Sequence, residues 1–296
     1  MSKPKLHHYV PQFYLRRFTD ASGRLWVWDA DQDRTFQALP DGIAAESHFY
    51  YLDDLADRGE DPLAMERYLS AVEGDGARIT GQWLAAVRQS KPKDPIEISP
   101  TDRNDAAIFF ATQYLRTADA KCLLSAWAGI QDGNRHLPPR EQRHLHASVL
   151  WGDEIFEWVA QKIYDSVWIF AHNRTDTPFL ASDNPILFRA GDNSMWLKTA
   201  LDMQGTYMVY PLAPDVMMYA HPKEPPLHRL ADMVSPVAFS EDMANSENTG
   251  QAFAASRFVI GNQNRFETVR EFALTIGTDQ YAGYWEKHRS GRKNSN

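Results

Sequence analysis

The sequence has one cysteine, Cys122, and no long hydrophobic run among its 296 residues. A single cysteine excludes an internal disulfide and a zinc site built from several cysteines. No stretch of 18 or more apolar residues occurs, and no hydrophobic segment with a small-residue cleavage site opens the chain. Because membrane spans and secretory signals need these features, we expect a cytoplasmic protein with no membrane partner.

Familiar catalytic signatures are also missing. The sequence contains no GxxxxGK loop, no GxGxxG after a predicted strand, no GxSxG elbow and no HExxH pair. Their absence disfavours a P-loop nucleotide hydrolase, a Rossmann cofactor site and a common serine hydrolase. The formal net charge of -8 is the wrong sign for a surface that wraps a phosphate backbone, although it is compatible with a local basic patch.

The pattern of apolar residues predicts helices in the first half of the chain and short strands in the second. Apolar spacings of three or four indicate helices, and short β-branched and aromatic runs bounded by turn residues indicate strands. The predicted helices cover about residues 63–87, 106–127, 153–164 and 247–255, and residues 99–102 are predicted to start the second of them. The predicted strands are an amino-terminal β-hairpin at 23–29 and 34–39, four strands of one sheet at 167–171, 179–182, 206–211 and 216–220, and a short strand at 258–260.

These elements predict an α+β fold, in which a helical first half packs on a mainly antiparallel sheet beside the amino-terminal hairpin. We expect a single domain over residues 1–286, with a sub-boundary near 90–100, where three prolines interrupt the pattern. Residues 287–296 are predicted to form a flexible basic tail.

The segment from His7 to Pro11 is the most distinctive local feature. An HHxxP pattern opens the site of some His-metal-finger nucleases, where one histidine is a general base and the other helps to bind a divalent metal. Those nucleases need an Asn or His some tens of residues later, and only His48 is available here. The structural alternative is an imidazole that fixes this segment by bonding the backbone. His8 is a candidate catalytic residue, and Gln12 is a candidate substrate-binding residue.

Glu66 and Glu73 lie seven residues apart on the first long helix, which returns them to almost the same face. Two carboxylates along an apolar stripe are costly to desolvate unless they meet cations, protons or a metal. Both are therefore candidate metal ligands, and Glu73 is also a candidate catalytic residue. Alternatively, the helix macrodipole accounts for Glu66, and Glu73 forms a structural pair with Arg116.

Gln113 and Arg116 share one face of the next helix, three residues apart. The guanidinium of Arg116 suits a carboxylate or phosphate, which makes Arg116 a candidate catalytic residue and Gln113 a candidate substrate-binding residue. A buried pair of Arg116 with Glu66 or Glu73 is the structural alternative.

Asp183 and Asn184 follow a predicted strand, and strand ends present side chains to clefts. Asp183 is a candidate catalytic base and metal ligand, and Asn184 is a candidate substrate-binding residue. The alternative is that both form a turn before Pro185 and bond their own backbone.

Seven motifs occur in a fixed order, and together they resemble the bacterial family called domain of unknown function 4238, from about residue 7 to residue 260. They are HHYVPQFYLRRF, RLWVWD, AAESHFYYLD, MERYLSAVE, FFATQYLRT, FLASDNPI and YPLAPD. The resemblance implies no activity. It implies that the following residues fall on motif positions: His8, Tyr9, Pro11, Gln12, Glu46, Tyr50, Glu66, Glu73, Gln113, Arg116, Asp183 and Pro185. If these residues form a site, they should converge on one pocket.

The leading functional hypothesis is a hydrolase that acts on a phosphate-containing substrate, such as a nucleic acid or a nucleotide. Glu66, Glu73 and Asp183 would hold a divalent metal or activate water with His8, and Arg116 would neutralise developing charge. One alternative is a non-catalytic binding protein, in which the same residues form a structural network. A second alternative is a toxin or phage-defence effector.

Overall fold

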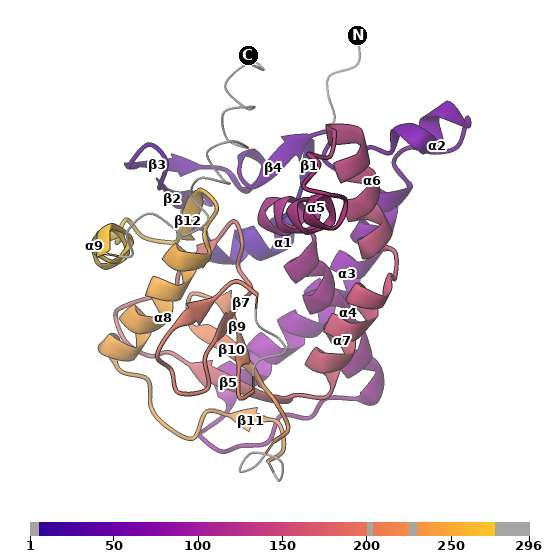
Figure 1. Ribbon diagram of the computed structural model, residues 1–296. Helices are drawn as coiled ribbons and strands as arrows, with labels where there is room; N and C mark the ends of the chain where they lie inside the picture. The colour runs from indigo at the N-terminus through magenta and orange to yellow at the C-terminus, as the bar shows by residue number, and fades with distance from the viewer. Residues whose placement is uncertain (1–5, 200–203, 225–229, 276–296) are drawn as a thin grey trace.

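The structure is a computed structural model that describes residues 6–199, 204–224 and 230–275 (Figure 1). Most helices gather on one side of the molecule, and the largest sheet lies on the other side. The helices are α1 (Gln12–Leu15), α2 (Asp53–Asp57), α3 (Ala64–Gln89), α4 (Pro100–Leu115), α5 (Ala118–Gln131), α6 (Pro139–Leu150), α7 (Glu154–Tyr164), α8 (Glu241–Ala254) and α9 (Glu267–Thr275), with 3-10 turns η1 (Arg16–Phe18) and η2 (Pro40–Gly42). None of the described helices is long and apolar enough to cross a bilayer.

The strands form three sheets within the described residues. The largest has the order β11 (Met233–Val234), β5 (Val167–His172), β10 (Val216–His221), β9 (Tyr207–Ala213), β7 (Leu187–Arg189) and β8 (Trp196–Leu197). The second has the order β3 (Arg34–Ala38), β2 (Leu25–Asp29), β12 (Phe258–Gly261) and β6 (Ala181–Ser182), and the smallest pairs β1 (Leu6–His8) with β4 (Ala45–Ser47). All pairings are antiparallel except that of β11 with β5. The predicted α+β class, the helical first half and the hairpin are confirmed.

The prediction of one sheet for the second half is wrong. Strand β6 does not join β5, β9 and β10. It pairs with β12, which pairs in turn with β2 of the hairpin. The carboxylate of Asp29 is fully buried and accepts a hydrogen bond of 2.9 Å from Arg257, directly before β12. Such long-range pairing leaves no local pattern in the sequence, because each strand alone is only a short apolar run.

The core lies where α3 and α4 pack on the largest sheet, while α8 covers strands at its other face. Trp83 of α3 contacts two aromatic rings of β5, with centroid separations of 5.3 Å to Trp168 and 5.5 Å to Phe170. Phe110 of α4 lies 5.5 Å from Tyr210 of β9. Burying large aromatic side chains supplies much of the stability of such a layer.

The predicted helix over 106–127 is also wrong, because the chain breaks between α4 and α5. Thr117 has extended backbone angles, and its hydroxyl accepts a hydrogen bond of 3.2 Å from the amide of Ala120. Threonine in this role caps the start of a new helix. The break gives Arg116, before the cap, and Asp119, after it, different surroundings. Helix α6 was not among the predicted helices.

A close contact between α3 and α4 gives a test of this packing. A Cβ atom on Gly76 would meet Cγ of Phe109 at 2.6 Å. We expect Gly76→Ala to lower the free energy of unfolding by about 1–3 kcal/mol. A Cβ atom on Gly81, also in α3, meets no heavy atom within 4 Å, so Gly81→Ala should raise it by about 0.5–1 kcal/mol. Urea unfolding measures both variants, and equal effects would contradict this packing.

Candidate functional site

A polar pocket of about 380 Å³ opens between β1, α1, α3 and the end of α4. We call it the histidine pocket. It brings together His8, Gln12, Glu66, Glu73 and Arg116, five of the predicted site residues. Its remaining lining residues are Leu6, His7, Phe13, Arg16, Tyr50, Leu69, Ser70, Gly74 and Ala77. The predicted convergence therefore holds for these five residues.

His7 is the buried histidine of the pair, a distinction that the sequence analysis did not make. Its Nδ1 accepts a hydrogen bond of 2.9 Å from the backbone amide of Tyr50, so the ring proton is on Nε2. Nε2 lies 3.5 Å from Oε2 of Glu66. The imidazole is also stacked parallel to the Tyr50 ring at 6.0 Å. His7 therefore has a fixed tautomer and connects β1 to α3.

His8 is half-buried and lines the pocket. Its Nε2 lies 3.2 Å from the carbonyl oxygen of Asp41. Because a carbonyl only accepts, this nitrogen carries the proton and Nδ1 keeps its lone pair. Burial is the main cause that lowers the pKa of His8, and the nearby Glu73 and Arg116 act in opposite directions. The ring is therefore neutral near pH 7 and able to accept a proton.

Arg116 is almost fully buried and makes three kinds of contact. Its Nη1 donates to Oε1 of Glu73 at 2.6 Å, and its Nη2 donates to the carbonyl oxygen of His8 at 2.6 Å. Its Nε donates to the hydroxyl of Tyr50 at 3.3 Å. Burial raises the pKa of Tyr50 to about 12, so this hydroxyl stays protonated. Arg116 therefore connects helix α3, strand β1 and the segment that holds Tyr50. Its ion pair with Glu73 is the structural alternative given in the sequence analysis.

The two predicted glutamines have different surroundings. Gln12 lines the pocket, and its Oε1 accepts a hydrogen bond of 2.7 Å from Nη2 of the exposed Arg16. Gln113 is not a pocket residue. It is fully buried, and its Nε2 lies 3.4 Å from the carbonyl oxygen of Tyr9. Gln113 therefore does not line the histidine pocket, because its amide is enclosed by the fold, and its substrate contact stays a prediction.

Asp183 and Asn184 belong to a separate group of polar residues, which we call the aspartate cluster: Asp119, Asp183, Asn184, Lys198 and Ser256. Oδ1 of Asp183 accepts a hydrogen bond of 2.8 Å from the amide of Ser256. Nδ2 of Asn184 donates to Oδ2 of Asp119 at 3.2 Å. Asp119, Lys198 and Ser256 were not predicted. The capping pattern at Thr117 could have pointed to Asp119, whereas no local signal marks the other two.

Glu66, Glu73 and Asp183 are not assembled into the predicted metal site. No group of three or more His, Cys, Asp and Glu side chains in the described part of the chain could hold a metal ion. Glu73 pairs with Arg116, whereas Asp183 bonds the backbone before β12. The two glutamates keep the same helix face, as predicted, and the third carboxylate lies in another cluster.

Asp183 has a strongly raised pKa. The pKa of Asp183 is raised to about 7, mainly by burial and to a smaller extent by the neighbouring Asp119, while hydrogen bonds from backbone amides and the charge of Lys198 lower it. A carboxyl group that is partly protonated near neutral pH is a candidate proton donor. Asp183 is nevertheless 2% exposed and does not line the histidine pocket, so its surroundings favour a structural role.

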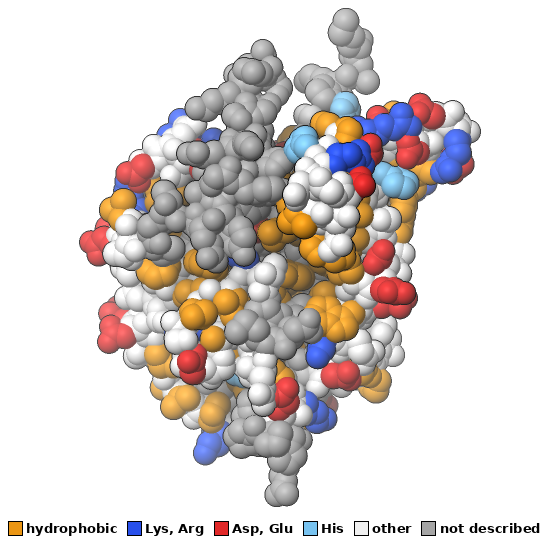
Figure 2. All heavy atoms as spheres, viewed as in Figure 1, with side chains coloured by type: hydrophobic (Ala, Val, Ile, Leu, Met, Phe, Trp, Pro, Cys, Tyr) orange, Lys and Arg blue, Asp and Glu red, His pale blue; other side chains and the backbone are white. Residues whose placement is uncertain are grey.

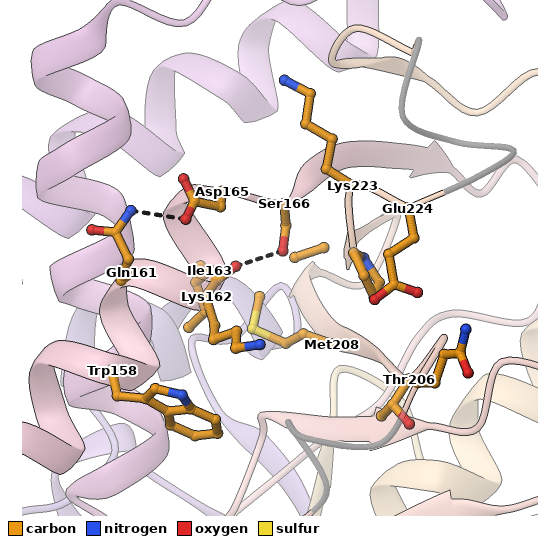
Figure 3. Close-up of a pocket in the computed structure, with 13 residues that line it drawn as sticks. Trp158, Gln161, Lys162, Ile163, Asp165, Ser166, Thr206, Met208, Lys223 and Glu224 are labelled. Carbon is orange, nitrogen blue, oxygen red and sulfur yellow. Dashed lines mark hydrogen bonds between the residues drawn. The ribbon is translucent and has the colours of Figure 1, made fainter.

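A further cavity of about 360 Å³ lies between α7 and the ends of strands β9 and β10 (Figure 3). Its charged side chains have mixed signs: they are those of Lys162, Asp165, Lys223 and Glu224. Figure 3 shows that Gln161 donates to Asp165, at 2.9 Å. None of the predicted site residues lines this cavity, so the histidine pocket is the better candidate site.

The fold is of the α+β class, and it contains a polar pocket. The HHxxP segment, helix α3 and the end of α4 contribute residues to this pocket. The profile of the family described as "Protein of unknown function (DUF4238)" matches residues 6–265. The chain belongs to this family. Comparison with curated proteins and with solved structures gave no match.

Proposed function

We propose that the histidine pocket is the active site of a cytoplasmic hydrolase that acts on a phosphate-containing substrate, with His8 as the general base. The observation that carries this proposal is the state of His8. Its Nε2 is held by the Asp41 carbonyl, its pKa is lowered by burial, and the ring lines an open polar pocket. A neutral imidazole with a fixed tautomer is suited to take a proton from water.

In the proposed reaction, Nδ1 of His8 takes a proton from a water molecule as the water oxygen attacks phosphorus. The bond from phosphorus to the leaving oxygen breaks, and that oxygen takes up a proton from solvent. The exposed guanidinium of Arg16, at the pocket rim, attracts the phosphate. Arg116 contributes positive charge from the pocket wall, although Glu73 neutralises much of it. A divalent ion, if used, would meet Glu66 and Glu73 on the same wall.

One observation favours the second candidate, a non-catalytic binding protein. The guanidinium of Arg116 is bonded to a carboxylate, a carbonyl and a hydroxyl within the protein. Residues that are buried and paired in this way stabilise the fold, because their hydrogen-bonding groups already have partners within the protein and do not need a substrate. In this case the pocket would bind a polar molecule without turnover.

An activity screen separates the two candidates. The wild-type protein is assayed with chromogenic phosphomonoesters and phosphodiesters and with single-stranded DNA and RNA, in EDTA and with Mg²⁺ or Mn²⁺. We expect His8→Ala to lower turnover by about 10²-fold or more, because general-base catalysis contributes about 10²–10⁴-fold. The matched control is His136→Ala, which changes an exposed histidine outside the pocket and should keep full activity.

The melting temperatures of both variants should stay close to that of the wild type. Absence of turnover with every substrate and ion would overturn the hydrolase and favour the binding protein. Turnover that survives in His8→Ala would show that the pocket is not the active site. Activity that disappears in EDTA would add a metal to the mechanism.

A further inference from the structure

A cavity of about 370 Å³ lies between α5 and α7 and is separate from the histidine pocket. We call it the α5–α7 cavity. Its walls are mainly apolar and come from the last turn of α4 and the facing sides of the two helices. The apolar lining residues are Leu115, Ala120, Leu123, Leu124, Ile155, Trp158 and Val159. A concave apolar cavity of a few hundred Å³ is typical of sites for small molecules.

Helices α5 and α7 leave several apolar side chains partly exposed to solvent. Leu123 and Leu124 of α5 are only partly buried, and Trp158 of α7 keeps 38% of its surface exposed. Figure 2 shows hydrophobic side chains gathered on the face of the molecule that carries these helices. Apolar surface left in water is unfavourable, and a bound apolar group would remove it from water.

The polar end of the cavity is built from residues of three separate segments, two of them buried. Asp119, at the start of α5, is 3% exposed, and Asn184, after β6, is 5% exposed. The Nζ of Lys198, after β8, lies 3.6 Å from Oδ1 of Asp119. All three residues line the cavity. Asp119 is buried, whereas the side chain of Lys198 keeps 18% of its surface exposed. A pair of opposite charges that is largely removed from water contributes little net stability compared with apolar residues of similar size, so its position beside an apolar cavity supports a role in ligand recognition.

We propose that the α5–α7 cavity binds a small uncharged amphiphile, with an apolar body and an amide or hydroxyl end. The apolar body lies between the two helices. The carbonyl or hydroxyl oxygen of the ligand accepts a hydrogen bond from the ammonium of Lys198, and its N–H or O–H donates to the carboxylate of Asp119. A charged end is less suitable, because the charges of Asp119 and Lys198 already balance each other. A carboxylate would be repelled by Asp119 and an ammonium by Lys198.

A set of eight-carbon probes with identical tails tests this proposal. Octanamide, 1-octanol, octanoate and octylammonium are titrated into the full-length protein by isothermal titration calorimetry, below their aggregation limits. We expect saturable one-to-one binding of octanamide and 1-octanol. The two charged probes should bind at least tenfold more weakly.

Three variants locate the site. Ala120→Leu places a larger side chain in the cavity and should weaken octanamide binding at least tenfold. Lys198→Met leaves the negative charge of Asp119 unbalanced, so it should remove the preference for octanamide over octylammonium and keep the preference over octanoate. Trp127→Ala changes an exposed apolar residue of α5 outside the cavity and should leave the affinity unchanged. Melting curves confirm that each variant is folded.

Absence of saturable binding, or equal binding of all four probes, would overturn the proposal. Binding that is unchanged by Ala120→Leu would also overturn it. Light scattering covers the remaining case, in which a second copy of the chain fills the cavity. A wild-type dimer that Ala120→Leu converts to a monomer would assign this surface to self-association.

Discussion

Arg116→Met should lower the free energy of unfolding by about 3 kcal/mol, the range found when one partner of a buried ion pair is removed. The guanidinium is 3% exposed and is bonded to Glu73, to the His8 carbonyl and to Tyr50. Methionine fills similar space but offers no donor. The variant would remove the donor from the Glu73 carboxylate and from the His8 carbonyl, whereas the Tyr50 hydroxyl would keep its hydrogen bond to the backbone carbonyl of residue 116. Urea unfolding followed by circular dichroism measures the change.

The matched control is Arg16→Met, which removes an exposed guanidinium bonded to Gln12. Exposed contacts of this kind contribute little, so a change below about 0.5 kcal/mol is expected. In the double variant Arg116→Met with Glu73→Gln, part of the loss should be recovered, because the unpaired carboxylate is gone. Equal effects of Arg116→Met and Arg16→Met would contradict the structural role assigned to the buried arginine.

Asp183→Asn should make the protein more stable than the wild type at pH 8, by an amount on the order of 2–4 kcal/mol. The raised pKa of Asp183, about 7, means that its ionisation inside the fold is unfavourable. Asparagine is neutral and keeps an oxygen for the hydrogen bond from the Ser256 amide. The same variant tests the predicted catalytic role of Asp183, because a structural acid can be neutralised without loss of activity.

The pH dependence of this gain has a definite sign. In the unfolded chain, Asp183 loses its proton near pH 4, whereas in the folded protein it keeps the proton up to about pH 7. Between these values the folded state binds more protons, so the contribution of Asp183 to stability falls as the pH rises. Buried Glu247, with its pKa raised to about 7 by burial, acts in the same direction in both proteins. The difference between them therefore isolates Asp183.

Unfolding curves from pH 4 to pH 8 measure this effect. The two proteins should be similar near pH 4 and should diverge as the pH rises towards 7. Asp192→Asn is the control, because Asp192 is exposed and hydrogen bonds from Ser194 lower its pKa. It should give no gain at pH 8. A wild-type protein that is more stable than Asp183→Asn at pH 8 would show that the ionised carboxylate is favoured in the fold.

Sequence periodicity predicted the elements whose signal is local. The apolar stripe of α3 and the polar turn of the hairpin are encoded within a few residues, so both were found. The shared face of Glu66 and Glu73 follows from helix geometry alone, and the pairing of Glu73 with Arg116 was foreseen as an alternative. The cap at Thr117 was also local, yet the apolar run around it concealed the break between α4 and α5.

The sequence by itself determined the α+β class, the long helix α3, the amino-terminal hairpin, the family and five residues of the histidine pocket. The tertiary structure decided which polar residues meet. It separated Asp183 from the glutamates, enclosed Gln113, fixed the tautomers of His7 and His8, and joined Asp119 to Lys198. These outcomes depend on the pairing and packing of segments that are far apart in the chain. Such contacts are set by the burial of whole surfaces and by long-range hydrogen bonds, which the order of residues in any one segment does not record.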